Sequence, residues 1–344
     1  MTPRRIPRRL AAILAATLAC AGLAAAAATP APTTVRFSLD RRFDAAATPF
    51  LLAKARGLFR NEGINLEADA AASSQDAIEK VASGARDIAM ADLTALIRYR
   101  NKPDAAPVKA VFVLFNRTPY AIVARKSRGI TTLGDLESRT LGVPADDPTI
   151  RQWPVVARAN GVDPAKVVIA NIGAAVREPM LSAGQVDAVT TYSFTTPVNL
   201  RDRGLPAGDM ILFRFADLGC VLYGHAVIVN PRFADEQGNA VKGFLRASLA
   251  GLKAALKDPA RAIDEILPQM DGAARDLELE RWRTIIRDNI VTDEVRRNGL
   301  GGIAADRFVA ALEQIGATMK FTRQTALDDI FDEAFLPPPA ARKL

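Results

Sequence analysis

Polar side chains recur where short apolar runs of this sequence end, and these are the residues that could do chemistry. Ser73, Ser74 and Gln75 precede a helical pattern, and Asp92 follows a short apolar run. Hydroxyl, amide and carboxylate groups of this kind orient a small molecule by hydrogen bonds. Because the chain contains no nucleophile elbow, HExxH motif or P-loop, we expect binding and not catalysis at these positions.

A metal centre or a catalytic triad would have to be built around one histidine. His225 is the only histidine, and the two cysteines are Cys20 and Cys220. Cys20 lies in an N-terminal leader, so the mature chain would keep one cysteine, which permits no internal disulfide and no paired-cysteine metal spacing. We therefore predict no catalytic residue, no metal and no cofactor, and we interpret His225 as a structural residue.

The first residues have the pattern of an export signal. Four arginines within residues 1–10 are followed by an uncharged, Ala-rich run over residues 10–28. A basic start, a short apolar run and small residues before a cut are typical of a signal peptide, here residues 1–28. A membrane span and a lipoprotein cut before Cys20 are the alternatives, the first disfavoured by a core at the lower edge of spanning length.

Charge excludes one class of partner. The chain has 45 basic and 38 acidic side chains, a net charge of +7, and removing the leader with its four arginines lowers it to +3. Such a balance lacks the concentrated positive charge of a nucleic-acid-binding protein. The chain is also long enough to form two domains.

Short β-like runs alternate with helical patterns in the first part of the chain. A strand is expected at residues 35–39, and Thr48-Pro49 is typical of a helix start, with Thr as the cap and Pro in the first turn. Strands at residues 65–70 and 88–91, with a helix between them from Ser73-Ser74, complete the series. This alternation predicts a mostly parallel sheet flanked by helices.

The same series returns about 100 residues later in the sequence. Asp147-Pro148 opens a helix as Thr48-Pro49 does, and Gly184 to Asp187 repeats the position of Gly84 to Asp87 between a helix and a strand. A helix that ends at a Gly shortly before a strand is common in α/β proteins. Several matches in register nevertheless favour two similar lobes.

Two β-like runs without a preceding helix, residues 120–125 and 225–230, bracket the second series. If both cross between the lobes, they form hinge strands about which a cleft could close. We predict an α/β fold with lobe one at residues 33–119 plus 225–335 and lobe two at residues 124–222. Helices are expected after Pro231, followed by a loose tail at residues 336–344.

Open α/β sheets bind ligands beyond the carboxyl ends of their strands and at helix N-termini. Tyr192 and Tyr223 could form aromatic walls, and Arg117 could pair with a carboxylate or sulfonate. Asp147 is expected to cap its helix, which disfavours an anion such as nitrate there. The rule, applied to both lobes and to the connecting segments, selects these candidate ligand-binding residues: Asp40, Phe43, Ser73, Ser74, Gln75, Asp92, Asn116, Arg117, Thr118, Asp147, Thr149, Gly173, Tyr192, Ser193 and Tyr223.

Several motifs, in order along the chain, resemble those of ABC-transporter solute-binding proteins. Residues 50–64 (FLLAKARGLFRNEGI) are similar to that family's "A…G.F..eGl" opening, and residues 81–92 (VASGARDIAMAD) to its "vasG..D.g..d" strand. The branch includes receptors for nitrate, alkanesulfonates, taurine and the pyrimidine precursor of thiamine. Two departures stand out: Arg41-Arg42 replaces an aromatic residue that often follows the first strand, and Asp146-Asp147-Pro148 replaces a Gly- or Ser-rich turn.

The resemblance implies a type II periplasmic-binding fold and a monomeric extracytoplasmic receptor. Such a receptor delivers a small organic molecule to an ABC transporter permease by cleft closure. It touches no nucleic acid, and it meets the membrane only through the transporter or through a lipid on Cys20. Two alternatives stay open: an enzyme of pyrimidine-precursor biosynthesis from the same family, and a ligand-sensing partner of a signalling protein. The ligand itself is left among pyrimidine precursors, aromatic acids, sulfonates and others.

Overall fold

Two five-stranded sheets organise the part of the chain that the computed structural model describes, which is residues 31–145, 147–270 and 272–344. The predicted signal peptide, Cys20 and Asp146 lie outside the described residues. Residues Thr33–Leu344 form one compact unit, which contains both sheets. No helix among the described residues is long and apolar enough to cross a membrane.

The first sheet has the strand order β2-β1-β3-β10-β4. All of its strands run parallel except β10, which pairs antiparallel with β3 and β4. The central strands β3 and β10 are buried along their whole length, so their apolar sequences need no alternation. The strands are β1 (Thr33–Leu39), β2 (Ile64–Ala70), β3 (Ile88–Asp92), β4 (Lys109–Val113) and β10 (His225–Val229).

The second sheet repeats this topology with the order β7-β6-β8-β5-β9. Here β5 is the antiparallel strand, paired with β8 and β9. Because β8 begins 100 residues after β3 and occupies the equivalent central position, the repeat in the sequence does correspond to two similar lobes. The strands are β5 (Tyr120–Arg125), β6 (Thr140–Pro144), β7 (Val168–Ile172), β8 (Ala188–Tyr192) and β9 (Met210–Arg214).

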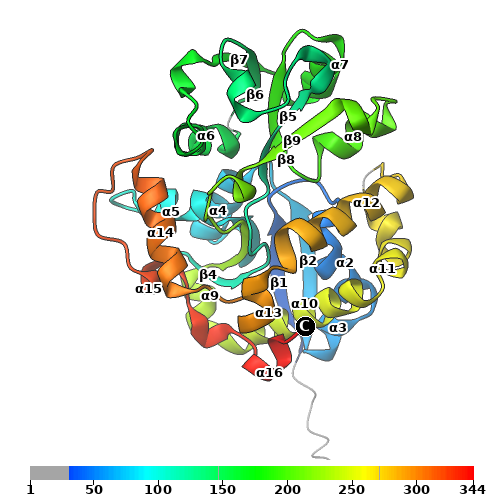
Figure 1. Ribbon diagram of the computed structural model, residues 1–344. Helices are drawn as coiled ribbons and strands as arrows, with labels where there is room; N and C mark the ends of the chain where they lie inside the picture. The colour runs from blue at the N-terminus through cyan, green and yellow to red at the C-terminus, as the bar shows by residue number, and fades with distance from the viewer. Residues whose placement is uncertain (1–30, 146, 271) are drawn as a thin grey trace, which may run out of the picture. The chain divides into compact units, whose positions relative to one another are not determined.

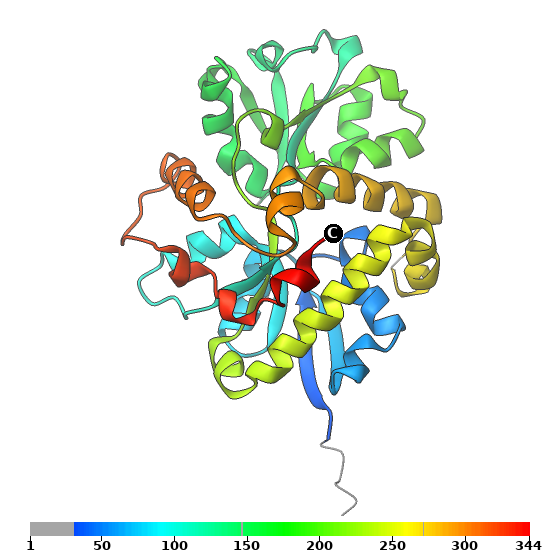
Figure 2. The ribbon, with the colours of Figure 1, turned by 60° about the horizontal axis from the view of Figure 1, so that its bottom comes forward.

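Helices flank both sheets (Figure 1). Figure 2 shows the long helix α10, which packs along α2. Trp153 and Trp282 are both buried in the cores beside the sheets. The helices are α2 (Thr48–Ala55), α3 (Leu58–Asn61), α4 (Ser74–Ala82), α5 (Leu93–Arg100), α6 (Pro148–Ala159), α7 (Arg177–Ala183), α8 (Thr196–Asp202), α9 (Pro231–Glu236), α10 (Gly238–Lys257), α11 (Pro259–Ile266), α12 (Arg275–Ile285), α13 (Asp293–Asn298), α14 (Ala305–Gly316), α15 (Leu327–Ile330) and α16 (Pro339–Arg342).

The helices at equivalent positions of the two lobes, α2 after β1 and α6 after β6, start differently. Asp147 caps α6 by accepting a hydrogen bond from the Thr149 amide, with Pro148 in the first turn, as the sequence predicts. Thr48, in contrast, lies inside α2 and is not its cap. A short 3-10 turn precedes α2, and Asp44 caps that turn through the Ala46 amide, so the helical segment begins before Thr48.

The chain crosses between the sheets just before the two strands that were predicted to be hinges. β5 lies wholly in the second sheet and β10 wholly in the first, each as the antiparallel strand. The crossings are therefore the segments 114–119 and 215–224, named the crossing segments from here on. The strands cannot cross because both of their edges are already paired within one sheet.

The C-terminal residues are held against the body of the protein, which corrects the prediction of a loose tail at residues 336–344. Arg342 exchanges two hydrogen bonds with Leu300: its carbonyl accepts from the Leu300 amide at 2.8 Å, and its Nη1 donates to the Leu300 carbonyl at 2.9 Å. Lys253 also donates to the Ala341 carbonyl. These partners are distant in sequence, so the Pro-rich composition alone gave no indication of them.

Candidate functional site

A cleft of about 440 Å³ lies between residues of the two sheets. The first-lobe wall comes from the segment after β1 and the start of α4, and the second-lobe wall comes from the starts of α6 and α7 and the end of β8. This is the place that the carboxyl-end rule predicts for a ligand. This main cleft is lined by Asp40, Arg41, Arg42, Asp44, Ala72, Ser73, Ser74, Asp147, Pro148, Ala174, Arg177, Thr191, Tyr192, Thr195 and Arg281.

Asp40 is the centre of the first-lobe wall. Its Oδ1 accepts from Arg41 Nε at 3.1 Å, its Oδ2 lies 2.9 Å from His225 Nε2, and Ser74 Oγ donates to the same Oδ2. Burial opposes the negative charge, but Arg41, His225 and Ser74 together outweigh it and lower the pKa of Asp40 well below its usual range. The carboxylate is therefore ionised and fully engaged by the protein itself.

Arg41 connects the two lobes. Its guanidinium lies over the ring of Tyr192, 4.7 Å from the centroid, and its Nη2 lies 2.9 Å from His225 Nε2. Burial disfavours its charge, yet Asp40 and the other neighbours raise the pKa of Arg41 above its ordinary value. A cation over an aromatic face is stabilised electrostatically, so this contact also fixes the Tyr192 ring.

His225 forms the floor behind these residues and does not line the main cleft. It is fully buried, and its ring meets those of Phe115 and Tyr192 edge to face, with centroids 5.1 and 5.7 Å apart. Its Nε2 lies within 2.9 Å of both Asp40 and Arg41 and can bond with only one of them at a time. These contacts agree with its interpretation as a structural residue.

Ser73 and Ser74 have separate tasks at the start of α4. Ser73 caps the helix by accepting from the Asp76 amide at 3.2 Å. Ser74 Oγ donates to Asp40 and accepts from the Asp92 amide at 3.0 Å, so it joins the ends of β1 and β3. Both line the main cleft, and Ser74 acts there mainly by holding Asp40 in place.

The second-lobe wall is built around the cap of α6. Asp147 accepts from Thr190 Oγ1 at 2.7 Å in addition to the Thr149 amide. Arg177 donates to the Thr190 carbonyl at 3.3 Å, and its Nε is buried without a hydrogen bond within the described part of the chain. This wall therefore offers a guanidinium and a carboxylate close to the Tyr192 ring.

Five of the predicted ligand-binding residues line the main cleft: Asp40, Ser73, Ser74, Asp147 and Tyr192. Gln75 and Asp92 line a neighbouring cavity, and Asn116 and Arg117 line a third one. The remaining candidates line none of these three cavities; they are Phe43, Thr118, Thr149, Gly173, Ser193 and Tyr223. Most of them are buried, and Thr149 bonds instead to the Thr191 carbonyl.

The cationic side of the main cleft is what the carboxyl-end rule missed. The rule does not predict Arg177 or Arg281, although Arg177 follows the predicted Gly173 by four residues. Arg281 comes from α12, where it pairs with Glu278 and donates to Asn199 at 2.6 Å. Arg41 had a visible indication in the sequence, since Arg41-Arg42 stands where the resembling family often has an aromatic residue.

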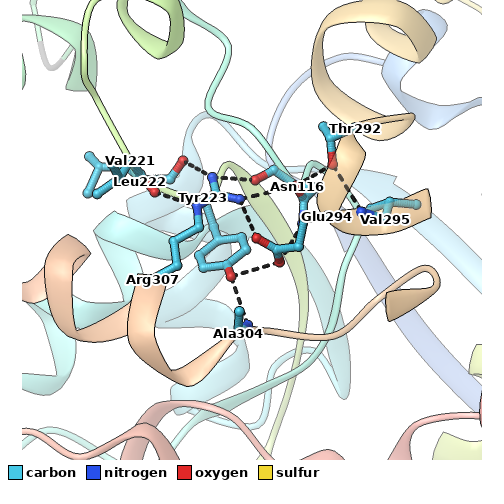
Figure 3. Close-up of polar contacts among 9 residues, drawn as sticks. All are labelled: Asn116, Val221, Leu222, Tyr223, Thr292, Glu294, Val295, Ala304 and Arg307. Carbon is cyan, nitrogen blue, oxygen red and sulfur yellow. Dashed lines mark hydrogen bonds and ion pairs between the residues drawn. The ribbon is translucent and has the colours of Figure 1, made fainter. Parts of the chain in front are cut away.

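Asn116 and Tyr223 belong to a polar network that joins the two crossing segments (Figure 3). Arg307 on α14 donates to the carbonyls of Asn116 and Leu222 and to Glu294, at 2.8, 3.1 and 3.0 Å. Its guanidinium lies 4.0 Å from the centroid of the Tyr223 ring, whose hydroxyl donates to Glu294. These residues therefore hold the connection between the lobes and do not line the main cleft.

A cavity of about 520 Å³ adjoins this network and is lined by Asn116, Arg117 and Cys220, among others. Arg117 is paired with Asp217 at 2.6 Å, so its charge is already matched. Cys220 is buried, and burial raises the pKa of its thiol to about 11. Among the described residues no cluster of His, Cys, Asp and Glu could hold a metal ion.

Residues 44–262 match the model of the family described as NMT1/THI5 like. A riboflavin-binding protein (RibY) of Chloroflexus aurantiacus is 27% identical over 68% of this chain, and the match spans 66% of that protein, just under two thirds. A formylaminopyrimidine-binding protein of Halalkalibacterium halodurans is 26% identical over 70% of this chain and 72% of its own length. A 4-amino-5-hydroxymethyl-2-methylpyrimidine phosphate synthase of Legionella pneumophila is 25% identical over 63% of this chain and 67% of its own length.

Solved structures show the same fold. The alkanesulfonate-binding protein SsuA from Xanthomonas axonopodis pv. citri, bound to MOPS, superposes with a TM-score of 0.67 over 88% of this chain and 99% of its own, at 16% identity. Two lobes with mixed five-stranded sheets, flanked by helices, are thus the fold of periplasmic-binding proteins. The predicted fold class is confirmed.

Proposed function

This chain belongs to the NMT1/THI5-like family, and from that premise we propose that it is an extracytoplasmic solute-binding receptor. The receptor takes up a small organic molecule in the main cleft and delivers it to the permease of an ABC transporter. It works as a monomer outside the cytoplasm, after removal of residues 1–28. Sequencing the N-terminus of the exported protein tests the last point: a start near residue 29 supports it, and a lipid-modified Cys20 supports the lipoprotein alternative.

One observation carries the proposal: the main cleft receives side chains from the ligand-binding edges of both sheets. Asp40 and Ser74 come from the first lobe, and Asp147, Arg177 and Tyr192 come from the second. A molecule that contacts both walls binds the closed arrangement better than an open one. It therefore shifts the population toward closure, which is the event a transporter can recognise.

The chemistry of the walls favours a planar, nitrogen-containing heteroaromatic solute. The Tyr192 ring, fixed by Arg41, offers a flat surface for stacking. Asp147 offers an acceptor for ring or amino N–H groups, and Arg177 offers donors for carbonyl oxygens. The names of the riboflavin-binding and formylaminopyrimidine-binding relatives support this class. A small bare anion such as nitrate is disfavoured at the start of α6, where Asp147 already occupies the cap.

An enzyme of pyrimidine biosynthesis is the second candidate, because several relatives are named as pyrimidine phosphate synthases. The contact between His225 and Asp40 is the arrangement with acid–base character that favours it. Phe115 and Tyr192 nevertheless pack against the His225 ring, and the imidazole does not line the main cleft. Binding is therefore the better supported function.

Thermal denaturation of the purified protein against a panel of solutes tests the receptor proposal. The panel contains riboflavin, pyrimidine precursors, aromatic acids, taurine, alkanesulfonates and nitrate. A solute present at about 100 times its Kd adds about 2.7 kcal/mol to the free energy of unfolding, a clear rise in Tm. One hit whose rise in Tm is clearly smaller in Tyr192→Ala supports the proposal, while the absence of any hit contradicts the ligand class. Conversion of a panel member, followed by mass spectrometry, would instead support the enzyme.

A further inference from the structure

We propose that a second cavity, next to the main cleft, binds a tetrahedral oxyanion, a phosphate or sulfonate group, between Arg98 and Lys102 of the first lobe and Arg151 of the second. This second cavity is named the oxyanion cavity. The inference deepens the proposed function, because the oxyanion can be a group carried by the transported solute. A free anion bound beside the solute would present the same chemistry.

The oxyanion cavity has a volume of about 290 Å³ and is lined by residues of both lobes. Arg98 projects from α5, which follows β3 of the first sheet, and Arg151 projects from the first turns of α6 in the second lobe. Pro148 lines both this cavity and the main cleft, and Ser74 and Gln75 are consecutive residues that line one each. The two cavities therefore adjoin at Pro148, and a solute that fills both would extend its charged group past this residue.

The side chain of Arg98 is held in position, and its positive charge has no ion-pair partner among the described residues. Its Nη2 donates to Thr318 Oγ1 at 2.7 Å, which fixes the guanidinium. Its Nε is buried and has no hydrogen-bond partner among residues 31–145, 147–270 and 272–344. Lys102 lies nearby with its Nζ 5.5 Å from the centroid of the Tyr99 ring, and both of these residues line the cavity. An oxyanion accepts hydrogen bonds from such a group of donors.

Two like charges face each other here from opposite lobes. The pKa of Arg98 is lowered, first by burial and then by the positive charge of Arg151, and the attraction of Asp92 does not restore it. Without an anion, this repulsion opposes the approach of the lobes. An oxyanion between the two guanidinium groups converts the repulsion into two attractions, so its binding and cleft closure favour each other.

The floor of the cavity contains one acidic residue, Asp92, whose charge opposes the binding of an anion only weakly. Asp92 and Tyr120 line it, and Asp92 accepts from the Ala95 amide at 2.8 Å. Burial raises the pKa of Asp92, so the negative charge of this carboxyl is disfavoured here. Three cationic side chains line the cavity against this single carboxyl: Arg98, Lys102 and Arg151.

Calorimetric titration with inorganic phosphate at constant ionic strength tests the site in the full protein. We expect phosphate to bind the wild type, and Arg98→Gln or Arg151→Gln to weaken that binding about tenfold or more. Arg158→Gln is the matched control, because it removes the same charge from the exposed last turn of α6 outside the cavity. The proposal is overturned if phosphate does not bind, or if all three variants bind it as the wild type does.

A folding defect is separated from loss of the site by the Tm measured without phosphate. Arg151 is exposed, so Arg151→Gln should melt no lower than the wild type, and relief of the repulsion should raise its Tm slightly. Loss of phosphate binding together with an unchanged or higher Tm supports the site. A lower Tm that accompanies the loss in both Arg98→Gln and Arg151→Gln would count against it.

Two probes that differ only by a phosphate group, riboflavin and flavin mononucleotide, distinguish the source of the oxyanion. Their binding is measured by fluorescence titration. A preference for the phosphorylated flavin that Arg151→Gln abolishes assigns the oxyanion to the solute. Phosphate binding that is additive with unphosphorylated flavin assigns it to a free anion. If a panel solute binds but neither phosphate nor the arginine variants have any effect, the receptor stands and the oxyanion cavity falls. If phosphate binds but no solute does, the oxyanion cavity is supported and the receptor proposal is contradicted.

Discussion

The main cleft and the oxyanion cavity share Pro148, yet they treat their charges in opposite ways. In the main cleft, Asp40 and Arg41 neutralise each other, and Ser74 completes the pairing. In the oxyanion cavity, the charge that acts most strongly on Arg98 is another cation from the opposite lobe. A paired site is ready before a ligand arrives, whereas a site of facing cations needs its ligand to become stable.

Because of this difference, the main cleft and the oxyanion cavity contribute differently to the stability of the protein. The pairs of the main cleft fix the Tyr192 ring at the end of β8 against the first lobe, so they contribute to the free energy of folding. The cations of the oxyanion cavity contribute little or oppose closure until an anion is present. Substitutions should therefore have large effects on stability in the main cleft and small effects in the oxyanion cavity.

The largest expected effect comes from Asp40→Ala. It leaves the half-buried Arg41 without its buried carboxylate partner, and breaking such a pair costs about 3–5 kcal/mol. Urea denaturation measures the loss. Glu236→Ala, which removes the partner of exposed Arg232, is the control and should change stability little. Equal effects in the two variants would mean that the pairs of the main cleft are not structural.

Arg307→Ala sharpens the contrast between an arginine held by a carboxylate and one that faces another cation. It removes the donors that join the Asn116 and Leu222 carbonyls and leaves Glu294 without its cation, so we expect a loss of about 3 kcal/mol. Arg151→Gln removes the same charge from a position opposite Arg98 and should leave stability unchanged or slightly higher. The comparison breaks down if both variants unfold at the same urea concentration.

Tyr192→Ala should lower solute affinity about tenfold while leaving phosphate affinity nearly unchanged, because the ring lines the main cleft and not the oxyanion cavity. Tyr192→Phe keeps the ring and its contacts with Arg41 and His225, and it serves as the conservative control. Fluorescence titration with the panel solute and calorimetry with phosphate give the two affinities. A tenfold loss in the Phe variant as well would assign the effect to the hydroxyl and not to stacking.

The smallest expected effect concerns pH, where Asp40 and Asp92 should differ in sign. The pKa of Asp40 is lowered, so its contribution to stability is complete above the ordinary Asp pKa of about 3.9 and is lost as the pH falls below it. The pKa of Asp92 is raised by burial, so the stability that its protonation supplies is present below about 3.9 and is lost as the pH rises through the raised pKa.

Asp92→Asn isolates this contribution. The amide oxygen can still accept from the Ala95 amide as the cap of α5, but the side chain no longer titrates. We expect the variant to gain stability relative to the wild type as the pH rises from about 4 to 7. Urea denaturation at several pH values measures the difference, and a difference that does not change with pH would contradict the raised pKa.

The two lobes were predictable because their signals are local. Gly84 and Gly184 end equivalent helices with positive φ, and Pro148 opens α6 beside its Asp cap. These are properties of a few neighbouring residues, which a single sequence displays. The carboxyl-end rule then selected Asp40 and Tyr192 from strand ends and Ser74 from a helix start, and all three line the main cleft.

The remaining parts depend on partners that are distant in sequence. Asn116 and Tyr223 were selected as ligand contacts because they lie on connecting segments, but Glu294 and Arg307, 71 to 191 residues away, hold them in another network. The C-terminal helix α16 is fixed by Leu300 in the same way. Arg281 reaches the main cleft from α12, and no spacing in the sequence relates it to Tyr192.

The buried state of Cys220 has a practical consequence for following closure. A thiol with a pKa of about 11 is almost entirely protonated at neutral pH, and thiolates, not thiols, react with alkylating dyes. One new cysteine placed on an exposed helix of each lobe would therefore be labelled without competition from Cys220. Two such dyes report the distance between the lobes while solute or phosphate is added.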